Sequence, residues 1–164
     1  MTEYFDSHCH LTAAAFRDDR EAVVHRAMEA GVKGLVTIAS SAIDAEVTLK
    51  LAKKYDGVWC TAGVHPHEAS NASGADILLL RDLARENSEV VAIGETGLDF
   101  YYDNSPRRLQ MGLFEEHLAL GAEIGLPVVV HAREADDEIA ELLRLMPAGT
   151  AGVLHCFTGG PQAF

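Results

Sequence analysis

The stretch Val128-Val129-Val130-His131 decides the fold, because it is a run of β-branched residues that ends on a polar side chain. Such a run is typical of a parallel strand with both faces buried. Similar apolar runs occur at residues 4–7, 35–39, 58–62, 90–94, 128–131 and 153–156. They begin about 20 to 40 residues apart, the size of one strand-helix unit. The spacing predicts parallel strands joined by crossover helices.

The segments between these runs have the periodicity of amphipathic helices. Apolar residues recur at helical spacing in two of them, at Val23, Val24, Ala27 and Met28, and at Ile139, Leu142, Leu143 and Met146. Ser105 and Pro106 predict the N-cap and first position of a long fourth helix, and Gly125 predicts its end. Alternating strands and helices predict an α/β fold whose parallel sheet is either open or closed as a barrel.

Four of the six runs end on histidine or glutamate. These residues are His8 and His10 after the first run, Glu95 after the fourth, His131 in the fifth and His155 in the sixth. Residues i and i+2 of a strand point to the same face, so both imidazoles of the first pair can reach one metal ion. Taken singly, these residues could also be unrelated loop histidines, a solvated carboxylate or hydrogen-bonded core histidines.

The repeated position favours a closed barrel, because the C-terminal ends of barrel strands meet at one mouth, where active sites lie. We therefore predict a TIM-type (β/α)8 barrel of which about six strand-helix units are present, as a single incomplete domain over residues 1–164. Imidazoles with a carboxylate and no thiolate suit Mg, Mn, Zn, Co or Fe with open coordination positions. A carboxylate can bridge two such ions, which could activate a water for attack at phosphorus or carbon.

Other polar side chains follow the same strands. His65 and His67 could bind substrate oxygens or transfer protons, or could form a polar turn held by the proline between them. Arg133 suits a phosphate or carboxylate, or a salt bridge to a nearby acidic residue. Asp99 is expected in the loop after the fourth strand, where it supports a ligand or faces the substrate. Asp6 could orient one of the first imidazoles.

The charge balance argues against one class of function. The net charge is −12, whereas a protein that grips duplex DNA along its backbone usually shows a basic face. Bound metal ions could still supply the positive charge that a phosphate ester needs.

The remaining composition indicates an ordinary globular protein. The three cysteines, Cys9, Cys60 and Cys156, are widely spaced and are expected to be small buried thiols. No apolar run reaches the roughly 18 residues of a membrane span, and the N-terminus lacks the basic region of a secretory signal. We therefore expect a cytoplasmic protein without membrane contact.

Five motifs resemble those of the TatD-type metal-dependent deoxyribonucleases and follow one another in that family's order. They are DSHCHL at residues 6–11, GVHPH at 63–67, GETGLDFY at 94–101, LPVVVHAR at 126–133 and HCFTG at 155–159. The motifs run from one end of the chain to the other, so the resemblance covers the whole sequence.

The resemblance implies an amidohydrolase-like TIM barrel with two divalent metal ions. The residues that match the family's metal ligands are His8, His10, Glu95, His131 and His155. Glu95 would bridge the ions, and His65 and Arg133 would contact the scissile phosphate as catalytic residues, with His67 and Asp99 also on the substrate side. The implied activity is 3′-to-5′ exonuclease action on single-stranded DNA or RNA, so nucleic acid would be a substrate rather than a stable partner.

The chain departs from the family in length. A (β/α)8 barrel typically needs about 250 residues, and the resemblance implies a last ligand, an aspartate after the eighth strand, that has no counterpart within these 164 residues. We therefore expect a C-terminally truncated barrel whose first and sixth strands are exposed edges. Weak or no hydrolysis is expected from the isolated chain.

Two other functions remain open. The same centre could hydrolyse an ester or amide, as in the D-aminoacyl-tRNA deacylases that some relatives are named for, and rates on an oligonucleotide and on a D-aminoacyl ester would separate the two. A non-catalytic remnant that binds only metal or a partner is the third possibility. Metal-dependent turnover by the purified 164-residue chain would exclude it.

Overall fold

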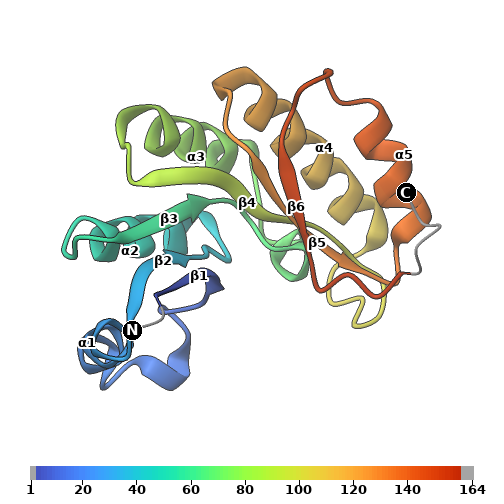
Figure 1. Ribbon diagram of the computed structural model, residues 1–164. Coiled ribbons are helices and arrows are strands. Elements are labelled where there is room, and N and C mark those ends of the chain that lie inside the picture. The colour runs from blue at the N-terminus through green and yellow to red at the C-terminus, as the bar shows by residue number, and fades with distance from the viewer. Residues whose placement is uncertain (1–2, 160–164) are drawn as a thin grey trace.

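A computed structural model describes residues 3–159, in which strands and helices alternate (Figure 1). The larger elements are β1 (Tyr4–Cys9), α1 (Arg20–Glu29), β2 (Val32–Thr37), α2 (Ala42–Ala52), β3 (Val58–Ala62), α3 (Gly74–Glu86), β4 (Val90–Asp99), α4 (Arg107–Ile124), β5 (Val128–Arg133), α5 (Asp136–Arg144) and β6 (Gly152–His155). Two short 3₁₀ helices, η1 (Ala14–Phe16) and η2 (Pro66–Glu68), follow β1 and β3.

The six strands form one parallel sheet in the order β1-β2-β3-β4-β5-β6, so each strand pairs with its neighbours along the chain. This arrangement confirms the predicted partial TIM-type barrel. As expected, β1 and β6 are the edge strands. Tyr4 and Phe5 on β1 are each 58% exposed and Val153 on β6 is 56% exposed, as befits strands with a partner on one side only.

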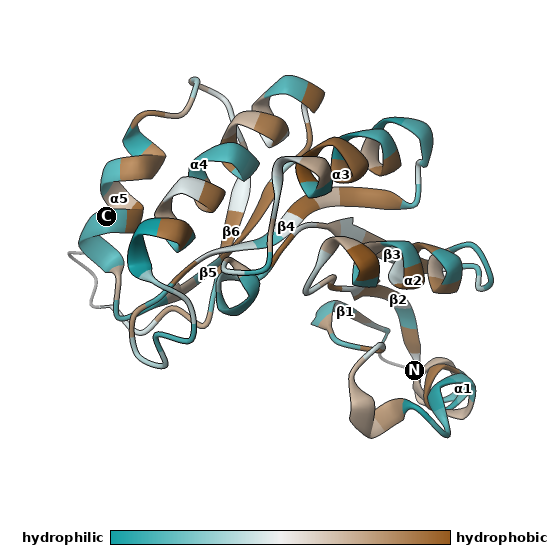
Figure 2. Cartoon of the chain, turned by 180° about the vertical axis from the view of Figure 1, so that it is seen from behind, coloured by the Kyte–Doolittle hydropathy of each residue, from teal (hydrophilic) through white to brown (hydrophobic). Residues whose placement is uncertain are grey.

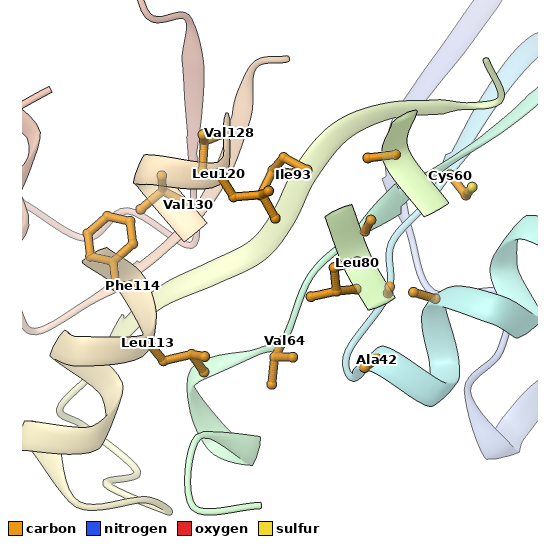
Figure 3. Close-up of a cluster of buried hydrophobic side chains, with 14 of the residues drawn as sticks. Ala42, Cys60, Val64, Leu80, Ile93, Leu113, Phe114, Leu120, Val128 and Val130 are labelled. Carbon is orange, nitrogen blue, oxygen red and sulfur yellow. The ribbon is translucent and has the colours of Figure 1, made fainter. Parts of the chain in front are cut away.

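The core lies between the sheet and the helices α1 to α5. Ile93 and Val128 from the sheet meet Phe114 and Leu120 from α4, as Figure 3 shows, and all four are buried. Figure 1 shows α3 and α4 over the same side of the sheet, and in Figure 2 the first residues of β4 are brown, as expected of a strand covered by helices.

Local sequence signals set the helix ends. The Ser41 hydroxyl accepts a hydrogen bond from the backbone N–H of Asp44 at the start of α2. At the start of α3, Ser73 donates to Oδ2 of Asp76 through both its backbone N–H and its hydroxyl. Gly125 ends α4 in the left-handed conformation, with φ of 79°, as its position predicted.

The strand boundaries differ from the predicted ones at the end that carries the site. Strand β1 continues to Cys9 and contains His8 instead of ending before it, and β4 continues to Asp99 instead of ending at residue 94. The prediction that Asp99 lies in a loop is therefore wrong. The motif after Gly94 lacks a β-branched apolar pattern, yet it pairs with β5 from Thr96 to Asp99 after a shift in register.

Gly97 explains why this polar segment can pair so closely with β5. Its φ is +127°, and a Cβ atom there would collide with the carbonyl oxygen of His131, its partner in the register. Only glycine combines this backbone conformation with this approach. The motif around Glu95 is thus held against the backbone of a second predicted ligand.

No helix within residues 3–159 is both long enough and apolar enough to cross a membrane. The cytoplasmic location stays a prediction.

Candidate metal centre

Glu95 lies at the centre of the predicted site and is 1% exposed. Its two carboxylate oxygens face imidazoles from β5 and β6 and from the end of β1. The contacts are His131 Nδ1 at 2.9 Å and His155 Nε2 at 4.0 Å from Oε1, and His8 Nε2 at 3.3 Å and His10 Nε2 at 3.7 Å from Oε2. The structure thus brings all five residues together, as the strand-end pattern predicted, and their coordination of metal stays a prediction.

The charge of Glu95 follows from this environment. Burial alone would raise the pKa of the carboxyl group, but the contacts of His131 and His8, together with the nearby His65, hold that pKa well below its usual range. The side chain is therefore ionised at neutral pH. A buried negative charge surrounded by imidazoles is suited to binding a cation.

Two atoms of this cluster are buried without a hydrogen-bond partner in the described chain, His8 Nε2 and Glu95 Oε2. Buried polar atoms normally have a partner, and these two face each other. The ligand atoms of His8, His10 and Glu95 all lie within 4.8 Å of one another, as do those of His65, Glu95 and His131. These imidazoles and this carboxylate could hold a divalent metal ion, and the unpartnered pair is where one fits.

His131 is held between two carboxylates. Its Nδ1 lies 2.9 Å from Glu95 Oε1 and its Nε2 lies 3.0 Å from Asp99 Oδ2. Burial lowers the pKa of the imidazole, but the two carboxylates outweigh burial and raise it. Both ring nitrogens of His131 therefore face carboxylates of the protein.

Asp99 organises the side of the site that faces β3. It is fully buried, and Oδ2 also contacts His67 Nε2 at 2.9 Å. Its other oxygen, Oδ1, accepts hydrogen bonds from the backbone N–H groups of Tyr101 and Tyr102 at 3.1 and 2.9 Å. Both oxygens of Asp99 are thus occupied by protein donors, which favours a role in holding His67 and His131 over direct contact with substrate.

His65 and His67 follow β3, and η2 begins at the proline between them. The His65 ring lies 4.6 Å from the His131 ring, and His65 Nε2 is 4.0 Å from Glu95 Oε1. Burial lowers the pKa of His65 to about 3, so this imidazole is neutral at physiological pH. Both histidines therefore face the centre. The sequence left a polar turn and a site role as alternatives for these histidines, and the structure shows that they lie at a turn and also face the site.

The sequence suggests that Asp6 orients an imidazole, but the carboxylate of Asp6 makes a different contact. Its Oδ1 accepts a hydrogen bond from the backbone N–H of His8 at 3.1 Å. It lies in the exposed first part of β1, where its carboxylate is directed to the strand backbone.

Buried polar residues that the sequence reasoning missed support the site from α4. Gln110 is fully buried: its Oε1 accepts from the backbone N–H of Asp99, and its Nε2 donates to the Ser105 carbonyl. Ser105 is not the N-cap of α4, contrary to the prediction, because its hydroxyl donates to the His67 carbonyl and accepts from the Ser70 N–H. The helix begins after Pro106 without a side-chain cap.

His117, to which the sequence analysis gave no role, ties α4 to the loop that carries His65. It is fully buried, with Nδ1 2.8 Å from the Leu113 carbonyl and Nε2 accepting the N–H of Val64 at 3.1 Å. Burial lowers the pKa of His117 to about 4, because protonation would place a charge in the core. The neutral ring is the form that accepts from Val64.

This burial predicts a pH-dependent stability. The unfolded chain binds a proton at His117 near pH 6.5 and the folded chain near pH 4, so the free energy of unfolding falls as the pH falls through that window. We expect His117 to account for a loss of about 2–3 kcal/mol between pH 7 and pH 4.5. Denaturant unfolding of the His117→Gln variant should show a correspondingly smaller pH dependence, and equal pH dependence in both proteins would exclude this role.

Arg133 lies at the same edge, at the end of β5, and is not engaged in the predicted salt bridge. Its guanidinium carbon lies 4.2 Å from the Tyr101 ring centroid and 4.7 Å from that of Tyr102. Within residues 3–159 no carboxylate forms an ion pair with it. Its positive charge is thus available to a ligand.

Cys156 differs from its expected character. It is exposed, so the prediction of a small buried thiol is wrong for it, whereas Cys60 is buried and Cys9 partly buried. Its sulfur lies within 4.8 Å of ligand atoms of His131 and His155. The sequence offered one signal for this proximity, its position directly after a predicted ligand at a strand end.

Comparison with known proteins gives consistent matches over nearly the whole chain. The family model described as TatD related DNase matches residues 5–164. A protein named 3'-5' ssDNA/RNA exonuclease TatD from Erwinia tasmaniensis is 45% identical over 157 residues, which cover 94% of this chain and 60% of that relative. Its namesake from Salmonella typhimurium is 41% identical, over 96% of this chain and 61% of the relative.

The fold of the chain is also similar to that of a solved structure. The crystal structure of YJJV, a TatD homologue from Escherichia coli K12, superposes with a TM-score of 0.90 at 32% sequence identity, over 98% of this chain and 62% of that one. The chain thus spans about 60% of the length of the curated relatives that it matches.

Proposed function

This chain belongs to the TatD-related DNase family, and from that premise we propose that it carries the metal-binding part of a hydrolase that cleaves phosphodiester bonds at the 3′ ends of single-stranded DNA or RNA. The names of its relatives support this substrate class. Nucleic acid would be a substrate, and the reaction would be hydrolysis by an activated water.

The observation that carries the proposal is the unpartnered, buried pair of Glu95 Oε2 and His8 Nε2. Two divalent ions would be held around Glu95, by His8 and His10 on one side and by His131 and His155 on the other, with Glu95 shared between them. When bound, such ions supply the positive charge that activates water and stabilises the oxygens on phosphorus. Mg, Mn, Zn, Co and Fe all suit this set of donors.

The other residues would position the phosphate. Arg133, which forms no ion pair with a carboxylate within residues 3–159, would contact a phosphate oxygen. His65 is neutral at physiological pH and could donate a hydrogen bond to a second oxygen. Asp99 would act through His67 and His131, which it holds by its Oδ2 atom. With a net charge of −12, the protein needs this local positive charge to accept a polyanion.

A hydrolysis assay with the protein purified from its native source tests the function. A 5′-labelled single-stranded oligonucleotide should shorten progressively from its 3′ end in the presence of a divalent metal. A chelator should lower the rate more than about 100-fold, since the metal supplies several kcal/mol of barrier lowering, and added metal should restore it. Chelator-resistant cleavage, or faster hydrolysis of a D-aminoacyl ester than of the oligonucleotide, would contradict the proposal.

A further inference from the structure

Two neighbouring aromatic side chains at the edge of the site have no role in the metal centre. Tyr101 and Tyr102 lie just after β4, beyond Phe100, and are 54% and 55% exposed. Their rings meet edge to face, with centroids 4.8 Å apart. Large aromatic groups that are left half in solvent beside a polar site are available to stack against a ligand.

These tyrosines are fixed relative to the centre. Their backbone N–H groups both donate to Oδ1 of Asp99, whose other oxygen contacts His67 and His131. The Tyr102 ring also lies 5.7 Å from the His67 ring, centroid to centroid. One buried carboxylate therefore sets the position of the exposed rings and of a predicted metal ligand, so a group stacked on the rings is held at a defined place beside the metal centre.

Arg133 adds a charge to the aromatic pair. Its guanidinium lies over both rings, at 4.2 and 4.7 Å from their centroids, which orients the side chain by cation–π attraction. Because no carboxylate in the described part of the chain neutralises it, the group still attracts an anion. An aromatic surface with an unpaired guanidinium beside it matches a nucleotide, which joins a flat base to a phosphate.

We propose that Tyr101, Tyr102 and Arg133 form a nucleotide subsite in which the terminal base of a single strand stacks on the tyrosines while the guanidinium contacts an adjacent phosphate. This inference rests on the proposed function and deepens it, because it explains how the site selects single strands. In a duplex the terminal base is already paired and stacked, so it would have to leave its partner before it could reach the rings.

A fluorescent base tests the subsite by binding alone. The probe is a single-stranded oligonucleotide with 2-aminopurine at its 3′ terminus and phosphorothioate linkages that resist hydrolysis, mixed with the Mn²⁺-loaded protein. Stacking should quench the terminal 2-aminopurine more than the same base at a central position. Tyr101→Ala and Tyr102→Ala should lose the quenching and bind about 5- to 100-fold more weakly.

Matched variants separate stacking from other effects. Tyr101→Phe and Tyr102→Phe keep the ring and should bind and quench like the wild type. Tyr4→Ala removes a similarly exposed tyrosine at the first residue of β1, whereas the site lies at the other end of that strand. This variant should change neither the binding nor the quenching. If the wild type hydrolyses DNA but both alanine variants bind and quench like it, the subsite is refuted and the function stands. If the wild type neither binds nor hydrolyses the oligonucleotide, both the subsite and the proposed function are refuted.

Discussion

Replacing Glu95 by glutamine is expected to abolish metal binding and to lower metal-dependent hydrolysis at least about 1000-fold. Glu95 supplies the shared carboxylate of the proposed centre, and five imidazoles lie within 4.0 Å of its oxygens. At a metal concentration about 100 times the dissociation constant, the wild type should gain about 2.7 kcal/mol in the free energy of unfolding. The variant should gain nothing.

Two features make this substitution informative. Glutamine has the shape of glutamate and no charge, so the variant keeps the packing of this buried site while it loses the carboxylate that a metal ion would need. Glu116→Gln, on the exposed face of α4, is the matched control and should respond to metal like the wild type. Denaturant unfolding with and without Mn²⁺ or Zn²⁺ measures all three proteins, and metal stabilisation of Glu95→Gln would refute the role of Glu95.

Replacing Asp99 by asparagine should weaken metal binding by about 10- to 100-fold, the usual effect of removing a group that orients a ligand. Asparagine can still accept the two backbone N–H groups through its oxygen, but its amide nitrogen would then face the ring nitrogens that Asp99 Oδ2 now contacts in His67 and His131. His131 would lose the partner that fixes its ring, while Glu95, His8 and His10 would remain in place.

Asp103→Asn provides the control for this change, because Asp103 lies in the same connection, about half exposed, with only an exposed ion pair to Arg107. Such a pair contributes little, so the metal affinity of that variant should equal that of the wild type. Calorimetric titration with Zn²⁺ compares the affinities. If Asp99→Asn bound metal within twofold of the wild type, Asp99 would not position His131.

Much of this fold could be read from the sequence because the strands are nearly continuous β-branched runs. The prediction was weakest where a strand is polar. The segment from Glu95 to Asp99 lacks an apolar pattern, and its pairing with β5 depends on the close approach that Gly97 allows. Asp99 was therefore expected in a loop, although it ends a strand and contacts two site histidines.

Geometry alone predicts that the site histidines lie near Glu95. It does not predict which residues of α4 hold the site in place. The C-terminal ends of barrel strands meet at one face, so a barrel prediction places His8, His131 and His155 near Glu95. Gln110 and His117 lie among the polar and apolar residues of α4, where sequence alone does not distinguish a buried polar side chain from an exposed one. Their contacts to the strand ends and loops depend on how α4 packs against the sheet.

The most direct test of the metal centre is anomalous X-ray diffraction from crystals of the protein soaked in Zn²⁺ or Mn²⁺. Anomalous peaks are expected at Glu95, one of them about 2.0–2.2 Å from a carboxylate oxygen and from nitrogens of His8 and His10. Metal bound elsewhere in the protein, with no peak beside Glu95, would contradict the proposed metal centre.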